Sequence, residues 1–160
     1  MLIRRARLND IDAVASLWLE MMLEHESRDR RFEMDAQSSG EYSRQLEEMM
    51  SNSEIAVFVA EQADEILGYI LVMVLMNPPY FRVKRYGFVA ELSVARTHRR
   101  TGAGGELWAR AVRWFKRKEI EVVQLNVSPE NTAGMAFWNS VGFEDFLVIK
   151  WHHLNEGQQK

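Results

Sequence analysis

The chain has 160 residues, a formal net charge of −3 at pH 7, 47% hydrophobic residues and no cysteine. This length suits one domain, so we expect residues 1–160 to form a single domain. The lack of cysteine excludes disulfides and thiolate metal sites, the acidic balance argues against a nucleic-acid binder, and no apolar run approaches the roughly 20 residues that span a bilayer. The composition therefore predicts a cytoplasmic protein with neither membrane nor nucleic acid as a partner.

The first third of the chain is predicted to contain one strand and two helices. Residues 2–7 read as a strand, and Asn9 is the candidate cap of a helix whose apolar residues recur at helical spacing. Residues 24–37 are polar and mixed in charge, so we expect a loop or a frayed helix there. A second helix is expected near residues 40–51, with a serine just before it as its cap.

Three strands are predicted in the middle of the chain. Residues 55–60 and 66–76 are rich in β-branched and aromatic side chains, and residues 63–65 form a plausible hairpin turn between them. Two prolines end the second strand, so residues 77–85 predict a long excursion that carries exposed aromatic and basic side chains. Residues 88–94 predict the central strand.

The last third is predicted to alternate helices and strands. A helix is expected over residues 102–118 and a strand over 122–127. Asn131 is a candidate cap of the next helix, and Gly142 suits the left-handed position at its end. Residues 146–154 are predicted to close the sheet. The order β-α-α-β-β-β-α-β-α-β predicts an α/β (α+β) fold with a mixed sheet.

The most informative stretch is the end of the central strand, residues 91–94, followed by the Gly-rich turn Arg99–Gly105 at a helix start. Backbone N–H groups converge at such a turn and the helix dipole adds partial positive charge, which suits a phosphate or pyrophosphate. Gly102 and Gly104 let the backbone approach an anion, and the two arginines add charge at the rim. Glycines that serve only tight strand–helix packing are the alternative interpretation.

Two segments together resemble one family. The spacing Arg99-x-x-Gly102-x-Gly104 resembles the acyl-CoA pyrophosphate loop of the GNAT N-acetyltransferase superfamily. The segment Asn131–Phe143 is similar to that family's Asn-x-x-Ala-x-x-Phe-Tyr-x-x-x-Gly-Phe segment. The resemblance implies a GNAT-like mixed central sheet of about six to seven strands flanked by about four helices. It also implies an acyl-CoA-dependent N-acetyltransferase that moves an acetyl group from acetyl-CoA to a primary amine.

The resemblance further implies where acetyl-CoA binds. In the family, the contacts come from the central strand, the Gly-rich turn and the helix that follows the next strand. The matching residues of this chain are Leu92, Ser93, Val94, Arg99, Arg100, Thr101, Gly102, Ala103, Gly104, Gly105, Asn131, Phe137 and Trp138. Backbone groups of Leu92 and Val94 would hold the pantetheine arm. The chain departs from the family at Gly134, where Ala is usual, and at Trp138, where Tyr is the usual proton donor.

Acetyl transfer requires a neutral amine, and an alkylamine with a pKa of about 10.4 must lose a proton before it attacks. Glu91 is the candidate catalytic base, acting directly or through water. It lies in an otherwise apolar strand, and two-residue alternation places it on the face opposite Leu92 and Val94. The alternative interpretation is a carboxylate paired with a Lys or Arg of a neighbouring strand.

The departing thiolate needs a proton, and Trp138 has only an indole N–H, which is no acid in the required range. The alternative proton donors are Tyr80, Tyr86, His98 and solvent. The spacing of the sequence favours none of the three side chains, so we expect solvent to be the donor. The four histidines show no ligand spacing, so no metal site is predicted.

The acceptor is left open by the sequence. Carboxylates in the polar segment, at Glu24, Glu26 and Asp29, favour a cationic small-molecule amine. An acetyltransferase of a protein N-terminus or lysine is one alternative, and a catalytically inactive acyl-CoA-binding sensor, which Trp138 favours, is another. A nucleotide-binding domain is disfavoured because the required Gly-Lys-Ser/Thr motif is missing. The resemblance also implies a homodimer.

Overall fold

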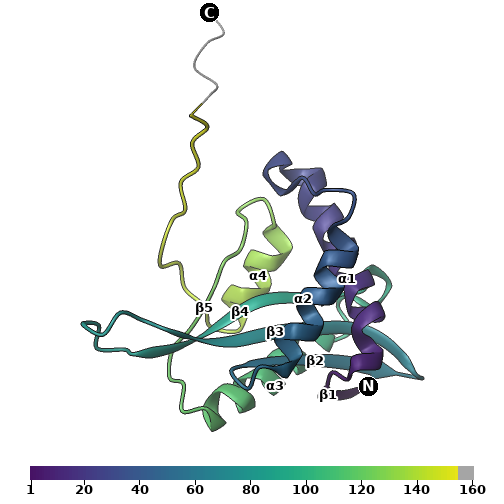
Figure 1. The fold of residues 1–160 in the computed structure, drawn as a ribbon, viewed down its shortest axis with the longest axis horizontal. Helices are drawn as coiled ribbons and strands as arrows, with labels where there is room; N and C mark the ends of the chain where they lie inside the picture. The colour runs from purple at the N-terminus through teal and green to yellow at the C-terminus, as the bar shows by residue number, and fades with distance from the viewer. Residues whose placement is uncertain (155–160) are drawn as a thin grey trace, which may run out of the picture.

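The computed structural model describes residues 1–154, and its centre is one five-stranded sheet in the order β1-β2-β3-β4-β5 (Figure 1). The strands are β1 (Leu2–Arg5), β2 (Ile55–Gln62), β3 (Glu65–Met76), β4 (Arg85–Val94) and β5 (Val123–Leu125). The first four pair antiparallel, whereas β5 runs parallel to β4. A helix connects β4 to β5, as a parallel pair requires.

Four helices cover the two faces of this sheet. They are α1 (Ile11–Arg28), α2 (Ser38–Ser51), α3 (Ala103–Arg117) and α4 (Thr132–Ser140). Single 3₁₀ turns, η1 (Leu8–Asp10), η2 (Arg30–Phe32) and η3 (Arg96–His98), flank α1 and precede the α3 turn. Helices α1 and α2 pack together on one face, and α3 lies across the other, with α4 beside it (Figure 1).

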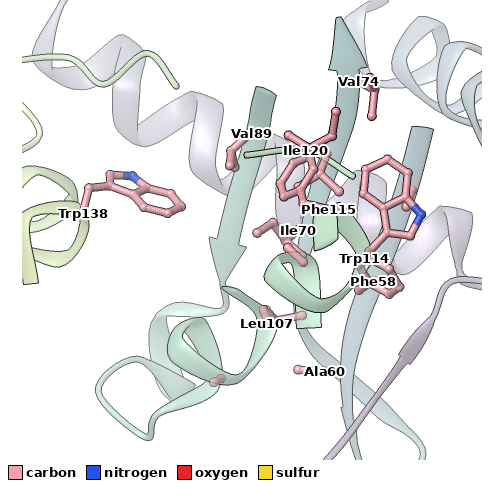
Figure 2. Close-up of a cluster of buried hydrophobic side chains, with 14 residues drawn as sticks. Phe58, Ala60, Ile70, Val74, Val89, Leu107, Trp114, Phe115, Ile120 and Trp138 are labelled. Carbon is pink, nitrogen blue, oxygen red and sulfur yellow. The ribbon is translucent and has the colours of Figure 1, made fainter. Parts of the chain in front are cut away.

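Each face of the sheet has its own hydrophobic cluster. On the α3 face, Leu107, Trp114 and Phe115 pack against inward-facing residues of β2, β3 and β4, and Trp138 of α4 lies at one end of the cluster (Figure 2). On the other face, residues of α1 and α2 pack on β2 and β3. Because strand side chains alternate between faces, β2 and β3 serve both clusters and are buried almost throughout.

Most predicted elements are confirmed. The turn expected at 63–65 is a hairpin whose two central residues, Ala63 and Asp64, have positive φ. Asn131 caps α4 by accepting a hydrogen bond from Gly134 N–H at 3.0 Å, and Gly142 has φ +96° directly after the helix. These local signals succeed because they reflect the needs of single backbone positions.

The starts of the first two helices differ from the prediction. Asn9 lies within the 3₁₀ turn η1, and Asp10 occupies the position before α1. Asp10 is buried and accepts hydrogen bonds from the Arg4 guanidinium, so its role is set by a tertiary contact. Helix α1 also continues to Arg28, into the segment 24–37 that was expected to be a loop or a frayed helix, and α2 begins directly at Ser38.

The sheet has fewer strands than expected. Residues 146–154 were predicted to close it, yet they form no strand and the sheet ends at β5. After Phe143, which packs against Trp108 and Trp138, the chain rises away from the sheet (Figure 1). β5 pairs with β4 over three residues only, so it offers a short outer edge. Residues 1–154 therefore form five strands, slightly fewer than the about six to seven expected, while the mixed α/β fold and the four helices are confirmed.

Among residues 1–154, no helix combines the length and apolar character that crossing a membrane would require. The cytoplasmic location stays a prediction.

Gly68 of β3 tests how tightly the sheet is packed beside the end of β4. A Cβ at this position would lie 2.7 Å from Ser93 O and 3.2 Å from Val94 Cα. We expect Gly68→Ala to lower the free energy of unfolding by about 1–3 kcal/mol, because the backbone of β4 must shift. Urea unfolding measures this.

The matched control is Gly40→Ala in α2, where a Cβ meets nothing within 4 Å. This substitution should stabilise the protein by about 0.5–1 kcal/mol, since Ala is the better helix former. Equal stability of the two variants would contradict the tight β3–β4 contact.

Candidate active site

Strands β4 and β5 separate part-way along their length. They pair only over Gly87–Val89 and Val123–Leu125, while β4 continues to Val94. A cavity of about 660 Å³ opens beyond the point of separation. Its walls are formed by the end of β4, the chain after β5, the start of α4 and the last turns of α1 with η2, and Ile149 and Trp151 of the C-terminal segment also line it.

The backbone of β4 faces this cavity in a regular pattern. Ala95 N–H donates to Leu67 O at 2.8 Å, and hydrogen-bonded pairs alternate along an antiparallel ladder. Ser93 opposite Tyr69 therefore belongs to a hydrogen-bonded pair, whereas Leu92 and Val94 turn their N–H and C=O groups away from β3. These two residues direct backbone groups to the side from which β5 has separated.

A β-bulge places Glu91 on the opposite face from Val89. Leu71 pairs with Glu91 but Val72 pairs with Val89, so Ala90 is an extra residue in β4. Without it, two-residue alternation would put Glu91 on the same face as Val89, which packs on α3. With it, the Glu91 side chain enters the face covered by α1 and α2.

Two tyrosines hold the Glu91 carboxylate. The Tyr42 hydroxyl of α2 donates to Oε2 at 2.6 Å, and the Tyr69 hydroxyl of β3 lies 2.8 Å from the same oxygen. The Tyr42 ring stacks on Trp18 of α1, with ring centroids 4.3 Å apart. Among residues 1–154, no Lys or Arg forms an ion pair with Glu91. The alternative interpretation, in which Glu91 pairs with a Lys or Arg of a neighbouring strand, is therefore wrong.

Burial raises the pKa of Glu91, and the hydrogen bonds from Tyr42 and Tyr69 partly oppose this by stabilising the carboxylate. Burial together with the nearby Glu91 charge raises the pKa of both tyrosines. Both therefore remain protonated donors at neutral pH. The site holds a carboxyl group whose proton affinity is increased and which borders a cavity, an arrangement that suits a general base.

Arg99 lies at the cavity wall in an ion-pair cluster. Its guanidinium donates to Glu24 Oε1 at 2.8 Å and to Val94 O at 3.1 Å. Arg96 also donates to Glu24 Oε1, at 2.9 Å. Burial opposes ionisation of Glu24, but the hydrogen bonds from Arg99 and Arg96 prevail and lower its pKa. The predicted rim arginine is thus paired with a carboxylate of α1.

The Gly-rich turn forms the start of α3, behind β4. Gly102 is the residue before the helix, with φ +92°, and it provides no side-chain cap for the first turn. The amide N–H groups at this helix start are therefore available to an anion. A Cβ on Gly104 would lie 3.6 Å from the Phe137 ring and 3.9 Å from Leu92, so this turn adjoins the cavity wall.

Aromatic side chains and Asn131 form the α4 side of the site. Trp138 is buried, and its ring contacts those of Phe137 and Phe143 edge-on (Figure 2 shows Trp138 reaching toward β4). A Cβ on Gly134 would lie 2.6 Å from Asn131 Nδ2. Glycine in place of the family's usual alanine thus lets the Asn131 side chain fold onto the helix start.

The comparisons with known proteins agree with this geometry. Residues 18–143 match the model of the acetyltransferase (GNAT) family. The chain belongs to this family. None of the curated proteins compared with it is significantly similar.

Several solved structures share this GNAT fold. A tetramutant of the BH1408 protein from Bacillus halodurans has a TM-score of 0.86 and 20% sequence identity, with 96% of this chain and 100% of that one covered. A predicted acetyltransferase from Clostridium acetobutylicum, solved with acetyl-CoA, has a TM-score of 0.76, 20% identity, and coverage of 96% and 95%. The aminoglycoside 6'-N-acetyltransferase AAC(6')-IG from Acinetobacter haemolyticus has a TM-score of 0.77, 14% identity, and coverage of 96% and 97%. At these identities the likeness shows the fold.

Seven of the predicted site residues line the cavity, and the other seven do not. Those that line the cavity are Glu91, Leu92, Ser93, Val94, Arg99, Asn131 and Trp138. Arg100, Thr101, Gly102, Ala103, Gly104, Gly105 and Phe137 do not line it. Thr101 donates its hydroxyl proton to His98 O at 2.7 Å, and Arg100 has a positive φ.

Sequence reasoning missed several residues of the site. Tyr42 and Tyr69 carry no local signal, because they meet Glu91 only after α2 packs on β3. His25 of α1 lines the cavity, and burial with the nearby Arg28 lowers its pKa. Met21 and Met22 of α1 also line it.

The proton donors considered from sequence lie elsewhere. None of Tyr80, Tyr86 and His98 borders the cavity. Among residues 1–154, no group of three or more His, Cys, Asp or Glu side chains could hold a metal ion.

The raised pKa of Glu91 predicts a pH-dependent stability. The folded protein retains this proton to higher pH than the unfolded chain, where the pKa is about 4.3. The stabilising effect of protonation is complete below the unfolded pKa and is lost as pH rises through the folded one. We expect the free energy of unfolding of wild type to decline relative to Glu91→Gln as the pH rises above about 4.3, the unfolded pKa.

Urea unfolding of both proteins across this range measures the difference. The same substitution at Glu47, an exposed residue of α2, is the control and should give a constant difference. A constant difference for Glu91→Gln as well would show that Glu91 is not held in a pKa-raising environment.

Proposed function

We propose that this protein is an acyl-CoA-dependent N-acetyltransferase that moves an acetyl group from acetyl-CoA to a primary amine of a small molecule. The main support for the proposal is the environment of Glu91. This residue is the cavity-lining carboxylate that has no Lys or Arg partner among residues 1–154, and burial raises its pKa. Directly beyond it, the backbone groups of Leu92 and Val94 face the gap between β4 and β5.

The donor side fits acetyl-CoA in its chemistry. Acetyl-CoA supplies an activated thioester on a long arm that ends in phosphates. The N–H groups of Leu92 and Val94 and the C=O group of Leu92 point away from β3. They suit the amide-bearing pantetheine arm, which would bind as an added strand does. The uncapped start of α3, at Gly102–Gly105, suits the pyrophosphate. The solved relative with acetyl-CoA supports this assignment.

On the acceptor side, Glu91 removes the proton that blocks attack. A protonated amine that reaches the cavity gives its proton to Glu91, directly or through water, and its nitrogen lone pair then forms a bond to the thioester carbonyl carbon. The carbon–sulfur bond breaks, and the nitrogen releases its second proton to solvent as the amide forms. The thiolate takes a proton from solvent, because Trp138 provides only an indole N–H. A backbone N–H of β4 polarises the carbonyl oxygen in this scheme.

Charge at the acceptor end is largely neutralised within the protein. Glu24 is paired with Arg96 and Arg99, and Asp29 is paired with Arg31. These carboxylates, expected from sequence to attract a cation, are therefore already satisfied, and Glu91 is the group that an amine meets. The aminoglycoside N-acetyltransferases among the solved relatives support a small-molecule amine as the acceptor.

Gly104 tests the cofactor site. We expect Gly104→Glu to abolish acetyl-CoA binding, because a carboxylate beside the α3 start repels the phosphates and fills the space next to Phe137 and Leu92. Calorimetric titration with acetyl-CoA measures the affinity. The control is Gly40→Glu, a glycine of α2 with open space around it. Wild-type affinity in Gly104→Glu would remove the phosphate-binding assignment.

Glu91 and Tyr42 test the chemical step. Glu91→Gln should lower kcat by about 10²–10⁴-fold with the affinity for acetyl-CoA unchanged. Tyr42→Phe removes a hydrogen bond that lowers the pKa of Glu91, so the acidic limb of the kcat/KM profile should move to higher pH. Tyr80→Phe, on an exposed loop, is the control and should leave the profile unchanged.

Release of the CoA thiol in the presence of a panel of amines provides the rate. A wild-type protein that binds acetyl-CoA but releases no thiol with any amine would favour the sensor alternative. A wild-type rate in Glu91→Gln would exclude Glu91 as the base.

A further inference from the structure

Helix α1 places flexible apolar side chains in the cavity on the face that Glu91 enters. The Ser93 hydroxyl donates to Leu17 O at 3.2 Å, so the middle of α1 lies against the end of β4. About one turn after Leu17, Met21 and Met22 line the cavity. Residues four apart on a helix share a face, so Met21 continues the surface that Leu17 turns toward β4. Methionines therefore form the cavity wall on the side of the candidate base.

Aromatic rings extend this apolar wall. Phe32 of η2 lines the cavity, and its ring packs on that of His25 with the centroids 5.0 Å apart. Trp151 lines the cavity as well, and its indole N–H donates to His153 Nε2 at 3.0 Å. Because that N–H already has an acceptor, Trp151 offers the cavity the apolar surface of its ring. Methionine sulfur and aromatic rings both make favourable contacts with an aromatic ligand.

The charged side chains of the cavity suit a ligand with a single positive charge. Glu24 and Asp29 line the cavity, but each is already paired with arginine side chains. Arg28 adds another positive charge to the wall, and burial lowers the pKa of His25, so that this imidazole is uncharged at neutral pH. In the part of the chain that the structure describes, a second ammonium group beside the one at Glu91 would meet no free carboxylate of the cavity.

We propose that the acceptor is an arylalkylamine, a primary amine with one positive charge and an aromatic body. Its amino group meets Glu91, and its ring contacts the α1 methionines, Phe32 and Trp151. Trp151 is 61% exposed, so an aromatic ring that covers it removes apolar surface of both partners from water. This inference rests on the proposed function, because it names the acceptor of the same reaction.

Two amines that differ by one phenyl ring test the substrate class. Thiol release is measured with 2-phenylethylamine, ethylamine and spermidine, each at saturating acetyl-CoA. We expect kcat/KM for 2-phenylethylamine to exceed that for ethylamine by about 10–100-fold, because the ring is buried on binding. Spermidine, a polycation without a ring, should react no faster than ethylamine. Equal values for 2-phenylethylamine and ethylamine, or a preference for spermidine, would overturn the inference and leave the proposed function intact.

Trp151 tests which side chain recognises the ring. Trp151→Ala should lower kcat/KM for 2-phenylethylamine by about 10-fold and leave that for ethylamine unchanged, because ethylamine has no ring to cover. Trp151→Phe keeps an aromatic surface and should retain most of the preference. The control is Phe81→Ala, a half-exposed aromatic residue between β3 and β4 that does not line the cavity, and it should keep the full preference. An equal loss for both amines in Trp151→Ala would overturn the proposed contact with the ring.

Direct binding separates the failure of this inference from the failure of the proposed function. 2-Phenylethylamine and spermidine are titrated calorimetrically into the protein saturated with CoA. Binding of 2-phenylethylamine without turnover of any amine would support the aromatic amine site and contradict the proposed acetyl transfer. If 2-phenylethylamine is neither bound nor acetylated, the inference is overturned, whichever other amines react.

Discussion

One extra residue in β4 governs the geometry of the candidate active site. Ala90 bulges between Val89 and Glu91, and every residue after it changes its relation to the sheet. The Glu91 side chain enters the α1 and α2 face, and the backbone groups of Leu92 turn toward the side that β5 leaves. The cavity exists because β5 stops pairing at the same level, so bulge and strand separation together create one site.

The bulge is supported by the hydrophobic core on the α2 side. Tyr42 and Tyr69 are both buried, and their hydroxyls meet at Glu91 Oε2. A carboxylate in this position would be costly without donors, since burying an ionised group requires compensation. The two hydroxyls provide it without a positive charge. The carboxylate is therefore kept in the core and yet left with a raised pKa, which a salt bridge would have lowered.

Glu24, unlike Glu91, is held in the cavity wall by positively charged side chains. Glu24 lies between Arg96 and Arg99, and this cluster ties the last turns of α1 to the segment before α3. The arginine assigned to the phosphate site by resemblance is thus also a structural link between two walls of the cavity. Because Arg96 and Arg99 neutralise the charge of Glu24, recognition of an amine depends on Glu91 and on the shape of the cavity.

The sequence by itself determined the order of elements from β1 to α4, the family resemblance and several backbone positions. Gly102 and Gly142 adopt the positive φ that their type permits, and Asn131 caps α4, because such requirements are local and are met by one residue type at one place. Glu91 was also identified as a candidate from its strand context.

Only the tertiary structure decided what surrounds these residues. Three features join positions that lie roughly 20 to 75 residues apart in the sequence: the Ala90 bulge, the hydrogen bonds of the two tyrosines to Glu91, and the ion pair of Arg99 with Glu24. A local sequence pattern does not contain information on such contacts. The end of the sheet is a case of the same kind. Residues 146–154 have a strand's composition, but a strand forms only where an edge is within reach, and β5 of the same chain is not paired with it.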